Sequence, residues 1–146
     1  MRVFVRIIFL SFLFLATTPS LWALQNGLPC GDMKYERHNM VDYGPLRISI
    51  IQGIANDVQG CAIPHACVGV FSEADFKLVA SGQTDSEGHF KIQDVPDGKY
   101  RLVVTSEGFC AANAPIILRR RPHAKEKLVA IMKPRGIDVC GYIEWK

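Results

Sequence analysis

The chain has 146 residues, 17 basic and 14 acidic side chains, and a formal net charge of +3. This length suits one domain of ordinary size. The small net charge disfavours a nucleic-acid partner, because phosphate binding requires a basic stripe or patch.

The N-terminus has the layout of a secretory signal peptide over residues 1–23. Arg2 and Arg6 precede an apolar run at residues 7–16, and the small residue Ala23 stands before the expected cleavage point. The run is too short to span a bilayer by itself, so we expect membrane contact only through a transient signal peptide. An uncleaved anchor is the alternative. Cleavage would leave 146 − 23 = 123 residues with a charge of 15 − 14 = +1, in a secreted, periplasmic or cell-envelope protein.

The mature part begins with an irregular segment, residues 24–46, and continues with short β-rich runs between turn signals. Runs of this length, separated by turns every eight to twelve residues, are typical of a β-sandwich or small barrel. The expected strands are, in chain order, LRISIIQGIAND (46–57), ACVGVF (66–71), KLVASGQT (77–84), HFKIQDV (89–95), KYRLVVT (99–105), APIILR (114–119) and KLVAIMKP (127–134). We predict an all-β domain over residues 47–134 and an extra C-terminal strand within 135–146.

Two blocks of residues with fixed spacing resemble the carboxypeptidase regulatory-like domain, a transthyretin-like (prealbumin-like) β-sandwich. The matching positions are Ile51, Gly53, Ala55, Asp57, Gly60, Ile63, Ala66 and Val68, then Thr84, Asp85, Gly88, Phe90, Ile92, Val95, Gly98, Tyr100, Leu102 and Val104, and finally Gly108 and Phe109. The resemblance covers about residues 48–134. It implies a seven- to eight-stranded Greek-key sandwich. In carboxypeptidases this domain accompanies a separate zinc peptidase domain and does not perform the chemistry, so the resemblance also implies a protein that is not an enzyme.

The stretch TDSEGHFKIQDVPDGKY holds four carboxylates and a histidine: Asp85, Glu87, His89, Asp94 and Asp97. A calcium loop would need further oxygen ligands at the D-x-[DN]-x-[DN]-G spacing, which this stretch does not supply. Asp followed by Gly three residues later is the chemistry of a hairpin turn, and Pro-Asp-Gly favours a second turn. We therefore interpret the acids as turn formers and expect no metal ion or other cofactor.

Five cysteines lie in the mature part and are all disulfide candidates: Cys30, Cys61, Cys67, Cys110 and Cys140. An oxidising compartment favours disulfides, and the odd number leaves at least one cysteine for another fate. The sequence does not choose among the pairings. Because Cys30 and Cys140 lie in the two flanks, we expect one disulfide to tie a flank to the sandwich.

The remaining candidate residues have a structural interpretation. His65 and Cys67 could form a base and a nucleophile, but no oxyanion-hole motif accompanies them. Tyr100 resembles a tyrosine corner, whose hydroxyl bonds to the backbone. The run of three arginines at 119–121 fits a solvated strand end or loop. Carbohydrate binding favours grouped aromatic faces, whereas Trp145 is the one tryptophan of the mature chain and Tyr142 lies on the opposite strand face.

These observations favour a secreted, non-catalytic module for binding, adhesion or structural support at the cell envelope, with an unknown envelope protein or glycan as its partner. A carbohydrate-binding module is the first alternative. A small extracellular hydrolase or metalloenzyme is the second, and it would need His, Cys or carboxylate groups that converge from distant parts of the chain.

Overall fold

Ten β-strands and their connecting turns make up the part of the chain that the computed structural model describes, residues 30–34, 44–122, 124–136 and 140–146. The strands are β1 (Leu46–Ile48), β2 (Ile51–Asp57), β3 (Cys67–Ser72), β4 (Leu78–Gln83), β5 (His89–Ile92), β6 (Gly98–Thr105), β7 (Phe109–Cys110), β8 (Ala112–Leu118), β9 (Leu128–Pro134) and β10 (Tyr142–Trp145). Within those residues no helix is long and apolar enough to cross a membrane. The all-β prediction is confirmed; the expected signal peptide and most of the 24–46 segment lie outside the described residues.

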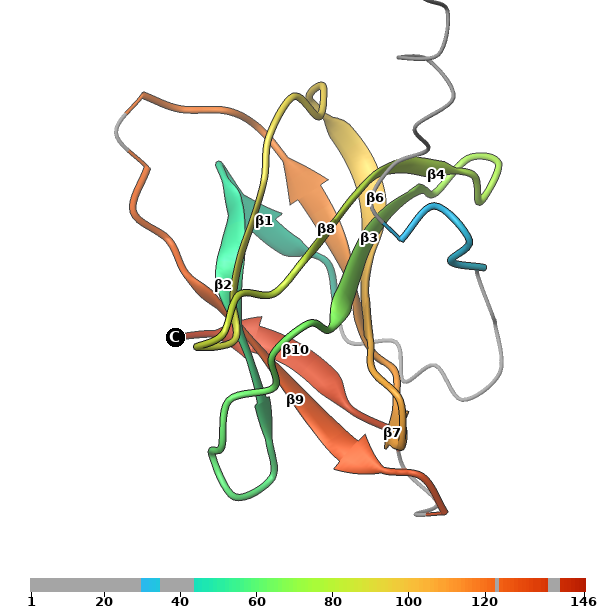
Figure 1. Cartoon of the computed structure of the whole chain (residues 1–146). Coiled ribbons are helices and arrows are strands. Elements are labelled where there is room, and N and C mark those ends of the chain that lie inside the picture. Colours follow the sequence, from blue (N-terminus) through green and yellow to red (C-terminus); the bar gives the residue numbers. More distant parts are fainter. Residues whose placement is uncertain (1–29, 35–43, 123, 137–139) are drawn as a thin grey trace, which may run out of the picture.

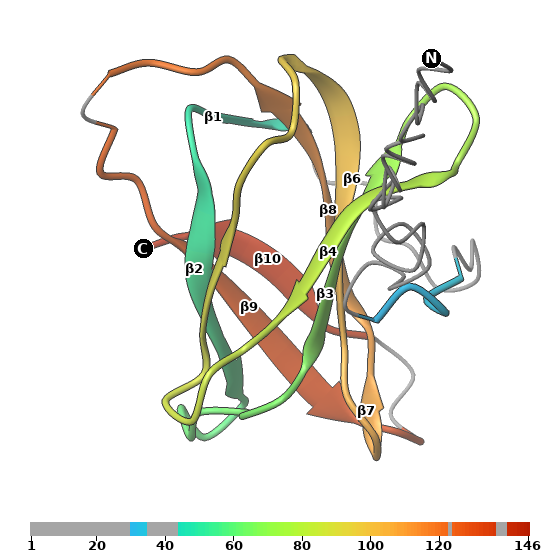
Figure 2. The ribbon, with the colours of Figure 1, turned by 45° about the horizontal axis from the view of Figure 1, so that its top comes forward.

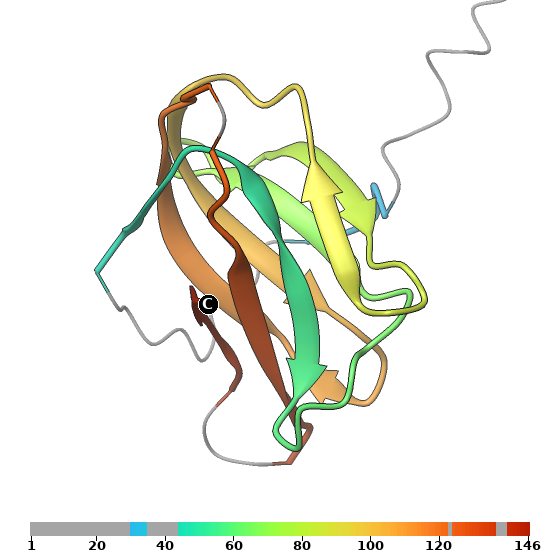
Figure 3. The same cartoon turned by 90° about the vertical axis from the view of Figure 1, so that its left-hand side faces the viewer.

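The strands form one nearly closed, barrel-like sheet in the order β4-β3-β6-β8-β10-β9-β2-β5, with β1 beside β8 and β7 beside β9. Figure 2 shows β2, β9 and β10 across from β3, β4 and β6, and Figure 3 shows β5 (yellow) beside β2. The strand number differs from the seven to eight expected. The expected strand at residues 46–57 is divided into β1 and β2, and the short strand β7 is an addition. Strand β10 pairs with β9 along four residues and touches β8 through Tyr142 and Asn113, so it joins two groups of strands that a sandwich would keep apart.

The core follows the alternation of apolar residues along the strands. Phe90 and Ile92 of β5 are buried, as are Leu102 and Val104 of β6, while their outward neighbours in β5 are exposed. This is the pattern of a sheet with one face on the core and the other facing water. The bulkiest fully buried side chains are Phe71, Ile51, Leu102, Ile116, Leu128 and Met132.

Strand β6 is an exception because it is buried on both faces, which its sequence does not indicate. Arg101 is only 6% exposed. Its guanidinium donates hydrogen bonds to a Glu73 carboxylate oxygen at 3.0 Å and to the side-chain oxygen of Asn113 at 3.1 Å. Partners of opposite charge and matching polarity are what a charged group needs when it leaves water.

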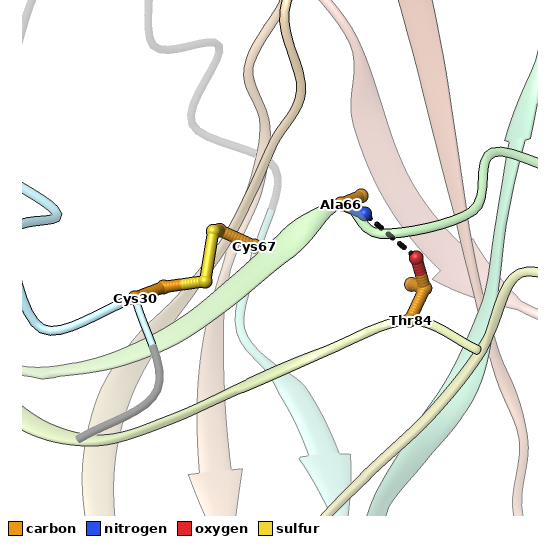
Figure 4. Close-up of a disulfide and its surroundings, with 4 residues drawn as sticks. All are labelled: Cys30, Ala66, Cys67 and Thr84. Carbon is orange, nitrogen blue, oxygen red and sulfur yellow. Dashed lines mark hydrogen bonds between the residues drawn. A yellow bond between two sulfur atoms is a disulfide. The ribbon is translucent and has the colours of Figure 1, made fainter.

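Two disulfides fasten the flanks to the strands. Cys30 of the N-terminal flank bonds to Cys67 at the start of β3 (Figure 4), and Cys140 bonds to Cys110 of β7. Both flanks are therefore tied down, where one such bond was expected. Cys61 is an exposed free cysteine.

Candidate functional site

The acidic stretch that begins at Asp85 folds into a hairpin turn. The Asp85 carboxylate accepts hydrogen bonds from the backbone N–H groups of Glu87, at 2.9 Å, and His89, at 2.8 Å. These two bonds, that of His89 first, hold the pKa of the Asp85 carboxyl below its ordinary value. The His89 ring nitrogen lies 3.8 Å from Asp85 and 3.7 Å from Glu87, longer than the contact of about 3 Å that proton transfer requires.

The turn at residues 57–60, which follows β2, repeats the chemistry of the Asp85 turn. Asp57 accepts hydrogen bonds from the backbone N–H groups of Gln59 and Cys61, each at 2.8 Å, and Gly60 has φ = +86°. In the first turn Gly88 has φ = +78°, so both are Asp-x-x-Gly turns closed by a left-handed glycine. In each turn one oxygen of the aspartate carboxylate accepts both backbone hydrogen bonds, so each aspartate closes its own turn.

The other two acids, Asp94 and Asp97, belong to the connection between β5 and β6. Asp97 accepts a hydrogen bond from the backbone N–H of Arg120 at 3.0 Å, so its side chain anchors a distant segment of the chain. Among the described residues no group of three or more His, Cys, Asp or Glu lies close enough together to hold a metal ion. Of the other histidines, His38 and His123 lie outside those residues.

The Pro-His-Ala-Cys segment is held in place by Thr84. The Thr84 hydroxyl accepts a hydrogen bond from the Ala66 N–H at 2.8 Å (Figure 4). It donates a second one to the Ile63 carbonyl, also at 2.8 Å. The sulfur of Cys67 forms a disulfide with Cys30, so it cannot act as a nucleophile in this oxidised state. His65 therefore has no Cys67 thiol to deprotonate. The segment is a structural support for the start of β3.

The aromatic candidates lie apart from one another. The Tyr100 hydroxyl donates to the Pro96 carbonyl at 2.9 Å, which is the geometry of a tyrosine corner. Trp145 is 42% exposed at the end of β10, and Tyr142, three residues earlier, is half-buried. Tyr35 and Tyr43, which could have contributed to a sugar platform, lie outside the described residues.

An open pocket of about 450 Å³ lies at one end of the sheet. Three segments line it: residues 49–51 between β1 and β2, residues 91–95 after β5, and the segment after β8 (orange loop at the upper left of Figure 1). The last segment contributes Leu118, Arg120, Arg121 and Ala124. We call this hollow the basic pocket.

The chemistry of the basic pocket is an aliphatic floor under a cationic rim. Its charged lining residues are Lys91, Arg120 and Arg121 against the single acid Asp94, a balance of 3 − 1 = +2. Arg120 is fixed at two points, by its backbone N–H to Asp97 and by its guanidinium to the Val95 carbonyl at 2.7 Å. One of the five guanidinium N–H donors is used in this way, and the others remain for a ligand.

Sequence reasoning placed the arginine run at a strand end, and β8 does end at Leu118, directly before it. The sequence did not indicate that residues 91–95 bring Lys91, Ile92 and Val95 to the same pocket as this arginine run. The signal that was available is the run itself, which is the only cluster of like charge in the chain.

A smaller hollow of about 300 Å³ adjoins the basic pocket along β5, and Lys91 lines both. Gln52, Gln83, Asp85, His89 and Lys127 supply its polar lining. We call it the polar groove. It brings Asp85 and His89 to one cavity, while Glu87 is not among its lining residues. Its aromatic residue, Phe90, is 4% exposed and belongs to the core.

Residues 50–125 match the carboxypeptidase regulatory-like domain family. The chain belongs to this family. The matched range begins in the turn before β2 and ends in the loop after β8, so it includes the three segments that form the basic pocket. No curated protein sequence is significantly similar to this family member.

Solved structures with a similar fold include two enzymes. One is 3-chlorocatechol 1,2-dioxygenase from Rhodococcus opacus 1CP, with 9% identity, a TM-score of 0.43 and coverage of 68% of each chain. The other is catechol 1,2-dioxygenase from Pseudomonas arvilla C-1, with 14% identity, a TM-score of 0.38, and coverage of 77% of this chain and 59% of the dioxygenase.

These similarities correct the expectation that the protein is not an enzyme. That expectation rested on the family resemblance and on the lack of local catalytic motifs, whereas both dioxygenases named above are enzymes. Catalytic groups can converge from distant segments, which short motifs do not reveal. At this identity and TM-score, the likeness gives no argument for dioxygenase activity in this chain.

Proposed function

We propose that this family member is a secreted binding module of the cell envelope and that the basic pocket is its ligand site. The observation that supports the site most directly is the convergence of three chain segments around one hollow with a net charge of +2. Concave sites of about 300–1,000 Å³ with apolar walls and a few placed polar groups are typical of small-ligand binding.

The proposed location outside the cytoplasm is supported by the two disulfides, since such bonds persist in oxidising compartments. The layout of residues 1–23 as a signal peptide supports the same location. N-terminal sequencing of the exported protein tests this part. Cleavage after Ala23 would give a chain that begins with Leu24, whereas an anchored protein would retain Met1.

The ligand site is tested by capture from the organism's own envelope fraction. The oxidised protein is immobilised in four forms: wild type, Arg120→Gln, Arg121→Gln and Arg119→Gln. Arg119 is a matched control, because it belongs to the same arginine run but does not line the pocket. We expect the captured ligand to be lost with the first two variants and retained with the third. Equal capture by all four would refute the assignment of the site.

A glycan is the second candidate ligand, and the polar groove is the observation that favours it. Gln52, Gln83 and His89, which carry hydrogen-bonding groups, all line that groove. Adding soluble glycans to the same capture experiment, together with a Gln83→Ala variant, tests this alternative. Competition by a neutral saccharide that depends on Gln83 and not on Arg120 would favour it.

A further inference from the structure

The basic pocket has a chemical character that narrows its ligand, and this inference rests on the proposed function. Its floor consists of aliphatic side chains: Ile50 and Ala124 are partly exposed, whereas Ile51, Ile92 and Leu118 are buried in the core beneath them. None of the described residues that line the pocket is aromatic. An aliphatic surface without an aromatic ring suits a flexible hydrocarbon better than the flat face of a sugar ring.

The rim adds a preference for negative charge. Arg120 and Arg121 stand on one side of the pocket and Lys91 on another, so cations approach a ligand from two chain segments. A guanidinium presents paired N–H donors in a planar fork that matches the two oxygens of a carboxylate. Asp94 is the one opposing charge in the lining.

The Arg120 side chain is also positioned before any ligand arrives. Its backbone N–H is held by Asp97 and its guanidinium by the Val95 carbonyl. A side chain that is already ordered loses less conformational entropy when it binds a ligand. Arg120 is therefore the stronger candidate for the group that orients a carboxylate, with Arg121 and Lys91 contributing attraction.

We infer that the basic pocket binds a ligand with a single terminal carboxylate on an aliphatic body. Two sources share this chemistry: a free medium-chain fatty acid, and the C-terminus of a peptide that ends in an aliphatic residue. In both cases the hydrocarbon would lie on the aliphatic floor and the carboxylate would receive hydrogen bonds from the guanidinium of Arg120.

Calorimetric titration of the oxidised full-length protein with octanoate tests this inference. The uncharged analogue 1-octanol and the cationic analogue octylamine are the ligand controls. We expect octanoate to bind at least about tenfold more tightly than either control, since a charge-assisted hydrogen bond and its Coulombic attraction would be absent. Raising the salt concentration from 20 to 300 mM should weaken octanoate binding, because the rim is exposed and screened.

Variants at the three neighbouring arginines test whether octanoate binds in the basic pocket. Arg120→Gln should weaken octanoate binding by roughly 10- to 100-fold. Arg121→Gln should weaken it by a smaller factor, and Arg119→Gln should leave it unchanged. Arg121, unlike Arg120, is not hydrogen-bonded to Asp97 or Val95, so its variant keeps the test valid if Arg120→Gln disturbs the fold. Equal binding of octanoate and octanol, or equal effects at positions 119 and 120, would overturn the inference.

The source of the carboxylate is resolved by a pair of peptides ending in Leu-Leu, one with a free carboxylate and one amidated. Tighter binding of the free peptide than of octanoate would identify a peptide C-terminus, and the reverse would identify a free acid. Binding of the amidated peptide as tightly as the free one would contradict a carboxylate ligand.

If envelope capture depends on Arg120 while neither octanoate nor the free peptide competes, the ligand class is wrong but the proposed site stands. If capture does not depend on Arg120 or Arg121, the proposed function itself fails.

Discussion

Replacement of Thr84 by valine is the sharpest test of how this fold is held together. Valine keeps the shape of threonine but removes the hydroxyl, so the N–H of Ala66 and the carbonyl of Ile63 lose their partner inside the protein. Each buried and unpaired backbone group costs about 1–3 kcal/mol. Thr84 is only 2% exposed, so water does not easily replace the hydroxyl. We expect the free energy of unfolding to fall by about 3 kcal/mol.

Thr84→Ser is the matched control for that change. Serine keeps the hydroxyl and both hydrogen bonds and loses one buried methyl group, for a cost of about 1 kcal/mol. Urea unfolding of the oxidised proteins, followed by far-ultraviolet circular dichroism, measures both variants. The valine variant should unfold at the lower urea concentration, with a Tm lower than wild type by roughly 10 °C. If Thr84→Val is as stable as Thr84→Ser, the hydroxyl does not stabilise this segment and the reasoning is wrong.

Three further expectations follow from the turns. Gly88→Ala should lower the free energy of unfolding by more than about 2 kcal/mol, because a Cβ there would lie 2.8 Å from the Ala55 carbonyl oxygen. Gly60→Ala has open space around it and should lower it by about 1 kcal/mol, for its positive φ alone. Equal losses of the two variants in urea unfolding would contradict this. The pKa of Asp85 is below the ordinary 3.8, so the ionised carboxylate stabilises the fold above pH 3.8, and this stabilisation is lost as the pH falls through the folded-state pKa. Asp85→Asn keeps the hydrogen-bond acceptor but does not titrate, so it should flatten the dependence of the free energy of unfolding on pH in the acid range. Thiol labelling in denaturant should find one reactive cysteine per chain, Cys61, and Cys61→Ser should change stability by no more than about 0.5 kcal/mol.

The sequence was sufficient for the strands whose pattern has one buried and one exposed face. In β5 the period-two placement of Phe90 and Ile92 agrees with the side chains that fill the core. The Asp-x-x-Gly spacing predicted the hairpin turn at Asp85 because its hydrogen bonds are all local in sequence. In such cases the chemistry that selects the structure is contained within a few neighbouring residues.

Long-range contacts explain what the sequence did not predict. The position of β10 between β8 and β9 depends on pairing between residues far apart in the chain, which no local pattern specifies. Arg101 was not predicted to be buried, because its partners Glu73 and Asn113 come from other parts of the sheet. The basic pocket was missed for the same reason, since residues 91–95 and the arginine run approach each other only in the folded chain.

The cationic rim of the proposed site lies outside the family motif, whereas the motif positions Ile51, Ile92 and Val95 line its aliphatic part. The polar groups of the motif hold the backbone instead: Asp85 and Asp57 each accept backbone N–H bonds at one carboxylate oxygen, and the Tyr100 hydroxyl donates to the Pro96 carbonyl. A ligand that competed for these bonds would gain little, since it would exchange one partner for another. Arg120, which is outside the motif, has donors that the fold does not use. Within this fold, specificity should therefore change through loop residues such as those at 91–95 and 119–121, while the turn residues stay fixed by what the backbone requires.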